Sequence, residues 1–391
     1  MKALRAGMNP PHRLSHARRA TRLQFFVLGV VVGTWGSHIP SVTARYSLSE
    51  ATLSIVLLTV AVGTVSALLI AGRVIARLGA RNTAAVCGLA MGVSLCFVLE
   101  HSSFAALLAA MLVFGASMSL FDVAVNTEGS ELECLGGRPI MSNLHGSFSV
   151  GGMAGAALTF ALLDLRITPQ VQLFAVGASV GALALLASRP MLATHASTVH
   201  ESGIAHFAWP KGILLLIGIL AFAGMTAEGI LYDWSVLYLK QELGMTQARA
   251  ALGYATFTAS MALARFGGDG LRARFSERAV LGCSATVAAV AMALMLISAN
   301  AWVAFVGLAV VGAGLAPVAP ILFNAATRVR GVSRAAAIAS VTTIGYSGFI
   351  VGPPVIGSIA TMTSLGVALF VVVLTAGAVA YGARFIPNGS T

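Results

Sequence analysis

Charged residues are scarce in this chain of 391 residues. They make up 9% of it, against about 25% in a typical soluble domain, while hydrophobic residues make up 58%. Thirteen acids and 24 bases are too few to cover a globule of this size with groups that water solvates. The composition excludes a soluble protein, so lipid must cover much of the surface.

Cysteine and enzymatic motifs are scarce as well. The four cysteines form no CxxC pair and three lie inside apolar runs, so neither a disulfide nor a zinc site is expected. The sequence contains no HExxH, no GxSxG and no phosphate-binding loop. We therefore expect a protein that is not an enzyme and that carries no cofactor and no metal.

Apolar runs long enough to cross a bilayer are abundant. A helix needs about 20 residues for one crossing, and twelve runs fit this length. They cover residues 23–43, 50–72, 83–99, 103–125, 141–163, 171–188, 212–239, 247–266, 279–298, 301–323, 335–360 and 364–383. The predicted fold class is an all-α membrane protein with twelve transmembrane helices.

A polar break from Arg189 to Lys211 separates the first six runs from the last six. We expect a basic cytoplasmic tail over residues 1–22 and a six-helix bundle over 23–188. A cytoplasmic linker over 189–211 should join it to a second six-helix bundle over 212–384, followed by a tail over 385–391.

Basic residues exceed acidic ones by 11, which in a soluble chain would suggest a nucleic-acid partner. Here the bases lie between the apolar runs, as in cytoplasmic loops of membrane proteins. With the N-terminus inside, nineteen lysines and arginines lie in inner segments, and the outer loops hold Arg45, Arg166, Lys240 and Arg249. Both termini are therefore expected in the cytoplasm, with the lipid bilayer and no nucleic acid as partner.

The two halves carry a repeat at an offset of 197 residues. Ser49-Glu50-Ala51 matches Thr246-Gln247-Ala248, residues 76–81 match 273–278, and Gly115-Ala116 matches Gly312-Ala313. Ser49 and Thr246 are suited to cap the start of a helix. Two parallel repeats of six helices are typical of transporters, whose solute site lies between the halves near the membrane midplane.

The segment 72–81, GRVIARLGAR, resembles the G-x-x-x-D-R-x-G-R-R/K signature of the major facilitator superfamily. Ala76 and Ala80 replace the family's aspartate and penultimate arginine. The resemblance implies that this loop and its repeat partner are cytoplasmic, and the residues concerned are Gly72, Arg77, Gly79, Arg81, Arg274 and Arg278.

Shorter segments resemble an enterobacterial inner-membrane subgroup of the same superfamily. They are residues 123–129, His145-Gly146, 227–229, Asp233-Trp234, Arg265-Phe266 and 352–354. The resemblance implies a bacterial inner-membrane transporter. Proton-coupled drug exporters of the superfamily carry a Gly-Pro signature in the fifth span, but residues 146–155 contain no proline, which disfavours that role.

Ionisable residues within the predicted spans are few, and each is a candidate because a charge in lipid is costly. A rise of about 1.5 Å per residue predicts an outer layer with His38, Glu228 and Asp233 and an inner layer with Asp122 and His145. These layers correspond to the two gates of an alternating-access transporter. Single carboxylates and histidines favour protons as the coupling ion, because protonation removes or adds their charge.

Several of these residues also have a structural interpretation. Glu228 can be half of a buried ion pair, and His38 can bond to a carbonyl that Pro40 leaves free. Arg265 has Asp269 one turn further on, so a local i,i+4 ion pair is its expected role.

Solute-binding candidates come from three features. Gly115, Ser119, Asp122 and Asn126 recur at helical spacing and form a small polar face, which can line a cavity or pack closely on another helix. Trp35 and Tyr232 lie near outer span ends, where they can anchor the protein in the membrane interface or stack on a solute.

Asn324 follows two prolines that interrupt the run 301–323, and broken helices often mark a binding site. Glu128 lies just beyond its run, as either a solvated loop acid or part of a site.

The sequence thus predicts a secondary active transporter of a small polar or weakly ionic solute, working by alternating access, coupled to protons and functional as a monomer. One alternative is a proton-driven drug exporter. Another, from a different class, is a membrane receptor that keeps the fold and transports nothing.

Overall fold

The computed structural model of the chain describes residues 10–137, 140–192, 210–272, 274–329, 332 and 334–387. This part is helical throughout, with short turns and no strand within the described ranges, which confirms the predicted all-α class. The predictions for Arg138 and for most of the linker, residues 193–209, fall outside it.

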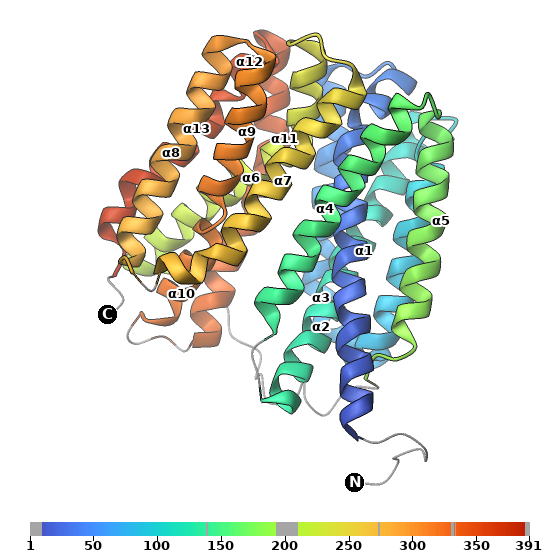
Figure 1. Cartoon of the computed structure of the whole chain (residues 1–391), viewed down its shortest axis with the longest axis vertical. Helices are drawn as coiled ribbons and strands as arrows, with labels where there is room; N and C mark the ends of the chain where they lie inside the picture. The colour runs from blue at the N-terminus through green and yellow to red at the C-terminus, as the bar shows by residue number, and fades with distance from the viewer. Residues whose placement is uncertain are drawn as a thin grey trace.

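Five helices come from the first half of the chain (Figure 1). They are α1 (Pro10–Arg45), α2 (Glu50–Phe97), α3 (Phe104–Gly136), α4 (Met141–Asp164) and α5 (Pro169–Ser188). The second half forms α6 (Ile213–Gln241), α7 (Gln247–Arg272), α8 (Glu277–Ser298), α9 (Ala301–Leu315), α10 (Val318–Thr327), α11 (Arg334–Met362), α12 (Leu365–Ala368) and α13 (Phe370–Gly382), then a 3-10 turn (Ala383–Phe385).

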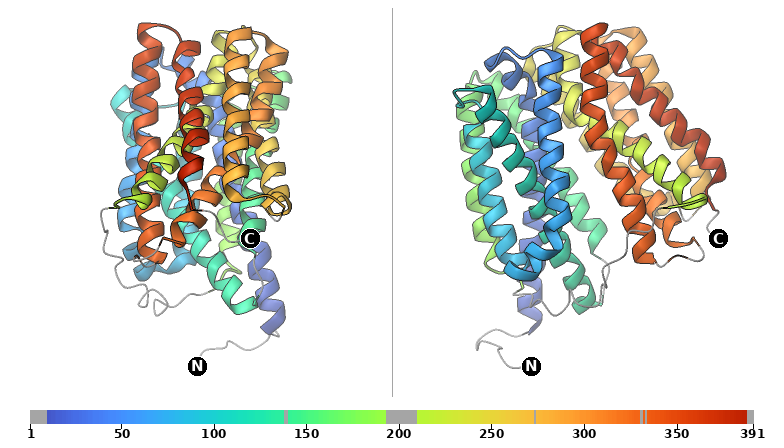
Figure 2. Two further views of the ribbon diagram at one scale, coloured as in Figure 1. Left: turned by 90° about the vertical axis from the view of Figure 1, so that its left-hand side faces the viewer. Right: turned by 180° about the vertical axis from the view of Figure 1, so that it is seen from behind.

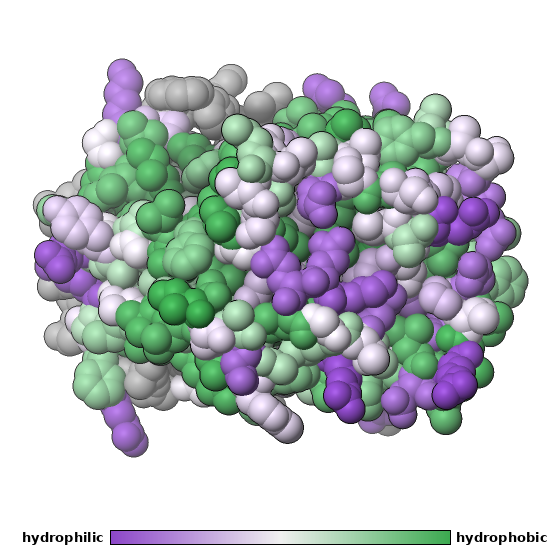
Figure 3. Space-filling model, turned by 90° about the horizontal axis from the view of Figure 1, so that it is seen from above, coloured by the Kyte–Doolittle hydropathy of each residue, from purple (hydrophilic) through white to green (hydrophobic). Residues whose placement is uncertain are grey.

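Ten helices of the described chain are long and apolar enough to cross a membrane. Each of the twelve predicted runs overlaps a helix, but α2 contains two of them and α7 is not among the ten. Large apolar side chains such as Leu69, Ile297 and Trp302 are exposed, as expected where lipid replaces water. In the end view of Figure 3, hydrophilic residues lie near the middle of the face and at its margins, with hydrophobic residues between them.

Helix α2 is interrupted at Gly79. As a straight rod its 48 residues would extend about 72 Å, more than twice the hydrocarbon thickness of a bilayer. Gly79 has φ 78° and ψ 155°, a conformation that residues with a Cβ rarely adopt. The second glycine of the motif is therefore required by the backbone, and it divides α2 into two arms.

The predicted helix caps are confirmed. The Ser49 hydroxyl accepts a hydrogen bond from the Thr52 amide at 3.3 Å, and the Thr246 hydroxyl accepts one from the Arg249 amide at 3.3 Å. The basic N-terminal segment is less of a tail than predicted, because α1 already begins at Pro10. Ala17 and Ala20 in this segment are buried, and apolar burial extends the helix beyond the predicted span.

The repeat at an offset of 197 residues recurs in the packing. Gly115 of α3 lies against the Val60 carbonyl of α2, and Gly312 of α9 lies against the Phe257 carbonyl of α7, 197 residues further along in both cases. In both places a side chain on the glycine would overlap the facing backbone. The same helix contact is therefore built twice.

Helices α1–α5 form one group and helices α6–α13 another (Figure 2). The groups meet mainly through α4 with α7 and α2 with α11, and α1 also contacts α6 and α7. Near one end, Gln247 of α7 donates hydrogen bonds to the Ser37 carbonyl at 3.0 Å and to the Ser41 hydroxyl at 2.7 Å. Helix α1 is therefore fastened to the second group at this end.

Candidate functional site

A charged pair lies deep between the two groups of helices. Arg265 of α7 places Nη2 at 3.2 Å from Oε1 of Glu228 on α6, and its Nη1 donates to the Ser149 hydroxyl of α4 at 3.4 Å. The side chains of Arg265 and Glu228 are 24% and 16% exposed, so the pair is only partly withdrawn from solvent. We call Glu228 and Arg265 the central ion pair.

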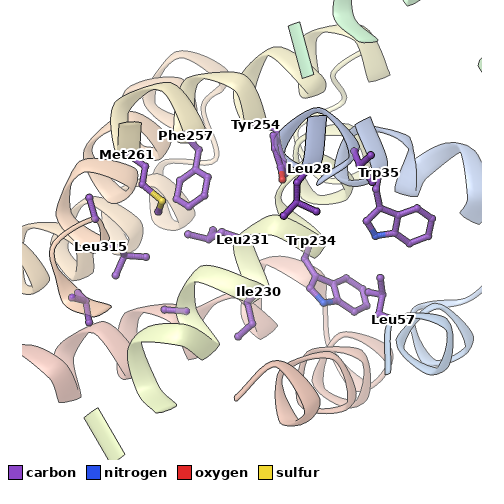
Figure 4. Close-up of a cluster of buried hydrophobic side chains, with 14 of the residues drawn as sticks. Leu28, Trp35, Leu57, Ile230, Leu231, Trp234, Tyr254, Phe257, Met261 and Leu315 are labelled. Atoms are coloured by element: carbon purple, nitrogen blue, oxygen red, sulfur yellow. The ribbon is translucent and has the colours of Figure 1, made fainter. Parts of the chain in front are cut away.

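Tyr232 completes this arrangement. It follows Glu228 by four residues on the same face of α6, and its hydroxyl donates to Glu228 Oε1 at 3.0 Å. Its ring packs on Tyr254 and Phe257 of α7, with centroids 5.8 and 5.6 Å away. Figure 4 shows Phe257 and Met261 beside Leu231 of α6, and Tyr254 beside Leu28 of α1. Tyr232 thus connects the carboxylate to an aromatic wall.

A small cavity lies beside this wall. Its volume is about 10 Å³, close to the space one water molecule needs. It is lined by residues of α1, α4, α6 and α7: Val32, Phe148, Ser149, Gly152, Tyr232, Tyr254, Thr258 and Met261. The hydroxyl groups among them offer a water or a small polar group hydrogen-bond partners.

The structure gives the position of Glu228 within its helix. Glu228 lies near the middle of α6, about 22 Å from its first residue and about 20 Å from its last, whereas His38 is about 10 Å from the end of α1. The predicted outer layer that Glu228 shares with His38 stays a prediction. Arg265 has a partner that the sequence did not indicate, Glu228, which is 37 residues away on another helix. The side chain of Asp269, its predicted local partner, lies outside the described residues.

His145 lies near the central ion pair. It is exposed, its ring meets the Phe25 ring edge-on with centroids 5.2 Å apart, and it interacts electrostatically with Arg265. The Ser149 hydroxyl bonds to the His145 carbonyl at 3.3 Å, one turn away on α4. This turn of α4 brings a titratable group and a hydroxyl to Arg265.

The small polar face of α3 has two different parts. Gly115 is used for close packing on α2, and Ser119 is buried. Asp122 and Asn126 are partly exposed, and the Asn126 amide donates to both the carbonyl and Oδ1 of Asp122 at 2.9 Å. Tyr346 of α11 lies close enough to both Asp122 and Glu228 for each carboxylate to act electrostatically on its hydroxyl group.

His38 lies apart from the central ion pair, whereas Asp233 lies close enough to Tyr254 to interact with it electrostatically. His38 is buried with Nδ1 at 3.2 Å from the Ser41 hydroxyl, the group that also accepts from Gln247. It belongs to the contact that fastens α1 to α7. Asp233 is partly buried and lies about 140° from Glu228 around the axis of α6.

Two substrate candidates and one loop acid have other surroundings. Trp35 is buried, with its ring centroid 5.5 Å from that of Phe114, which excludes an anchor in the membrane interface. Asn324 is exposed and donates to Glu277 Oε1 at 2.6 Å at the start of α8, away from the central ion pair. Glu128 is fully buried and accepts a bond from the Leu192 amide at 2.6 Å, so it is not a solvated loop acid.

Most residues of the two motif loops lie at helix ends or near the break of α2, and Gly72 lies within the first arm of α2. Gly72 has open space around it, Arg77 is exposed and Arg81 is partly exposed. Arg274 is exposed, and Arg278 donates to the Ile386 carbonyl at 2.6 Å. Arg278 therefore ties the start of α8 to the last turn of the described chain.

The sequence did not single out Ser149, Tyr254 or Tyr346. A signal exists for Ser149, which follows His145 by four residues, but Tyr254 and Tyr346 have only apolar and small neighbours in the sequence. Over the described residues, no group of three histidine, cysteine or acidic side chains has a metal-binding arrangement.

Comparisons with known proteins find relatives and solved structures that are named as transporters. An uncharacterized MFS-type transporter of Yersinia pestis is 35% identical over 371 residues, covering 94% of this chain and 95% of the relative. The crystal structure of the nucleoside transporter NupG matches with a TM-score of 0.76 at 16% identity, covering 97% and 99% of the two chains. That of a D-xylose-proton symporter matches with a TM-score of 0.74 at 14% identity, covering 96% and 97%. No family model matches the chain.

Proposed function

Since the chain belongs to the major facilitator superfamily, we propose that it is a secondary active transporter that moves a small polar or weakly ionic solute by alternating access, coupled to protons. It is a multi-pass protein of the bacterial inner membrane, and its relatives are transporters and not enzymes. One of the solved structures it resembles is a proton symporter, which is compatible with this coupling.

The observation that carries the proposal is the central ion pair. Arg265 contacts Glu228 on α6 and Ser149 on α4, so one guanidinium joins helices of both groups. A proton on Glu228 would remove the charge that holds Arg265 and weaken this connection. Proton binding would thereby be coupled to the relative movement of the two groups.

We also propose the topology behind this mechanism. The chain crosses the membrane twelve times, with both termini in the cytoplasm and with six-helix units over residues 23–188 and 212–384. The distribution of lysine and arginine and the duplicated contacts of Gly115 and Gly312 support this arrangement. The protein functions as a monomer, because each chain contains both repeats of the transport unit.

The test begins with a thermal-shift screen of the purified protein against nucleosides, sugars and organic acids. For a compound that stabilises the protein, counterflow and uptake driven by a pH gradient are then measured in proteoliposomes. Glu228→Gln imitates the protonated carboxyl, so it should retain counterflow, which needs no net proton movement, and lose accumulation. Asp122→Asn should slow release of the solute on the cytoplasmic side.

Undiminished accumulation by Glu228→Gln would exclude Glu228 as the proton carrier. Stabilisation by a ligand without any counterflow would indicate a receptor. Uptake or efflux restricted to lipophilic cations would indicate a drug exporter. The first outcome would move the proton to another residue, and either of the other two would replace the proposed function.

A further inference from the structure

A second cavity opens away from the central ion pair, between one end of α4, the first turns of α1 and the last part of α7. Its volume is about 460 Å³. Arg19, Arg22 and Phe26 of α1, Asn143 and Ser147 of α4, and Phe266 of α7 form most of its lining. We call this cavity the basic groove. Figure 1 shows the three helices that border it.

The basic groove lies on the outer side of α4. Asn143, Ser147 and Val150 follow each other at helical spacing and share one face, whereas His145 and Ser149 are each two residues out of step and lie on roughly the opposite face. The second face is the one that meets Arg265. The groove is therefore separated from the candidate solute site by the body of the helix.

Apolar side chains at the groove are open to the surroundings. Phe266, Val150 and Leu23 are all exposed although they are large and hydrophobic, and the Phe266 ring lies directly against Gly146 of α4. In a membrane protein such a surface faces hydrocarbon chains. A molecule that binds in the groove must therefore have an apolar part that contacts these side chains.

The other end of the groove is positively charged. Arg19 and Arg22 are three residues apart on one face of α1, and both are exposed. None of the residues that line the groove is acidic, and the Asn143 amide adds a hydrogen-bond donor. Arg22 is the last base before the apolar part of α1, so the two guanidinium groups lie at the depth of lipid headgroups.

From this combination we infer that the basic groove binds an anionic phospholipid. The phosphate contacts Arg19 and Arg22, and an acyl chain lies over Phe26, Val150 and Phe266. Basic pockets between transmembrane helices are known to bind lipid headgroups in this way. Because Phe266 belongs to α7 and the arginines to α1, the lipid contacts both groups of helices and is suited to respond to their relative movement.

Native mass spectrometry of the full-length protein, released from nanodiscs that contain phosphatidylglycerol and phosphatidylcholine in equal amounts, tests the inference. The wild type should retain phosphatidylglycerol preferentially. Arg19→Gln combined with Arg22→Gln should weaken retention by about tenfold or more, as expected for the loss of two basic residues near a headgroup. Arg166→Gln combined with Arg249→Gln removes two exposed arginines elsewhere and should leave retention unchanged.

A steric variant tests the shape of the groove without changing its charge. Val150→Trp places a bulky ring on an exposed position and should lower retention of phosphatidylglycerol at least severalfold, while the protein stays monodisperse. Added glycerol 3-phosphate should not replace the lipid, since it lacks the acyl chain. Equal losses for both arginine pairs, unchanged retention in Val150→Trp, or displacement by glycerol 3-phosphate would each overturn the assignment.

Discussion

Arg265 makes the connection on which the candidate site depends. A partly buried guanidinium satisfies Glu228 and reaches a hydroxyl on α4, and each partner lies on a different helix. Removal of one member of such a pair leaves the other charge without compensation, which costs more than removal of both. The partial exposure of the two side chains reduces this free-energy cost, but removal of one member still destabilises the protein.

A double-mutant cycle measures this coupling. Arg265→Gln should lower the melting temperature of the purified protein, because Glu228 then remains as an unpaired carboxylate. Adding Glu228→Gln should recover part of the loss, with a coupling of about 0.5–3 kcal/mol. Strictly additive effects of the two substitutions would show that the residues do not stabilise one another.

Sequence reasoning reached Glu228 and missed its partner for a physical reason. An acid within an apolar run stands out because its burial is expensive, whatever lies around it. The partner of an arginine depends on which helix faces it, and along the sequence only Asp269, one turn further on, could be considered. The same limit applies to Tyr254 and Tyr346, whose positions near the charged groups arise only from helix packing.

The sequence predicts individual helices more completely than it predicts the partners of single side chains. Apolar runs locate them, and the hydroxyls of Ser49 and Thr246 begin two of them as expected. The boundaries that differ are those set by tertiary contact. Helix α1 starts before its apolar run, and Ala17 and Ala20 in the added turns are buried.

The duplicated glycine contacts predict that alanine substitutions will affect stability differently at different glycines. Gly115→Ala and Gly312→Ala should each lower the melting temperature, because the new methyl group overlaps a carbonyl oxygen on the facing helix, a cost of about 1–3 kcal/mol. Gly377→Ala on α13 meets no atom within 4 Å and should leave the temperature unchanged or raise it through helix propensity. A similar response of all three variants would mean that neither contact is tight.

Across the whole molecule, composition and charge distribution predict the fold class, because lipid exposure is a property of many residues together. The number of crossings is harder to predict from helices alone. Helix α2 contains two of the predicted runs within one continuous helix. Helix α7 is more polar than its neighbours because its residues form part of the interior.

The topology can be measured with introduced cysteines. Leu78 and Phe275 are exposed, lie 197 residues apart, and belong to the two loops expected on the cytoplasmic side. In a background without the exposed Cys134 and Cys283, Leu78→Cys and Phe275→Cys should react with an impermeant thiol reagent only after the inner face is opened. The exposed Leu165→Cys should react in intact spheroplasts. Labelling in the reverse order would invert the proposed orientation.

Helix α1 has a mechanical consequence for how the two groups move. Near one end it is clamped to α7 through Ser37 and Ser41, and toward the other end it carries Arg19, 22 residues from Ser41 and about 33 Å away along the helix axis. A rod held in this way is a lever with its fulcrum at the clamp. A rotation of about 10° there displaces the far end by about 6 Å, roughly the pitch of one helical turn.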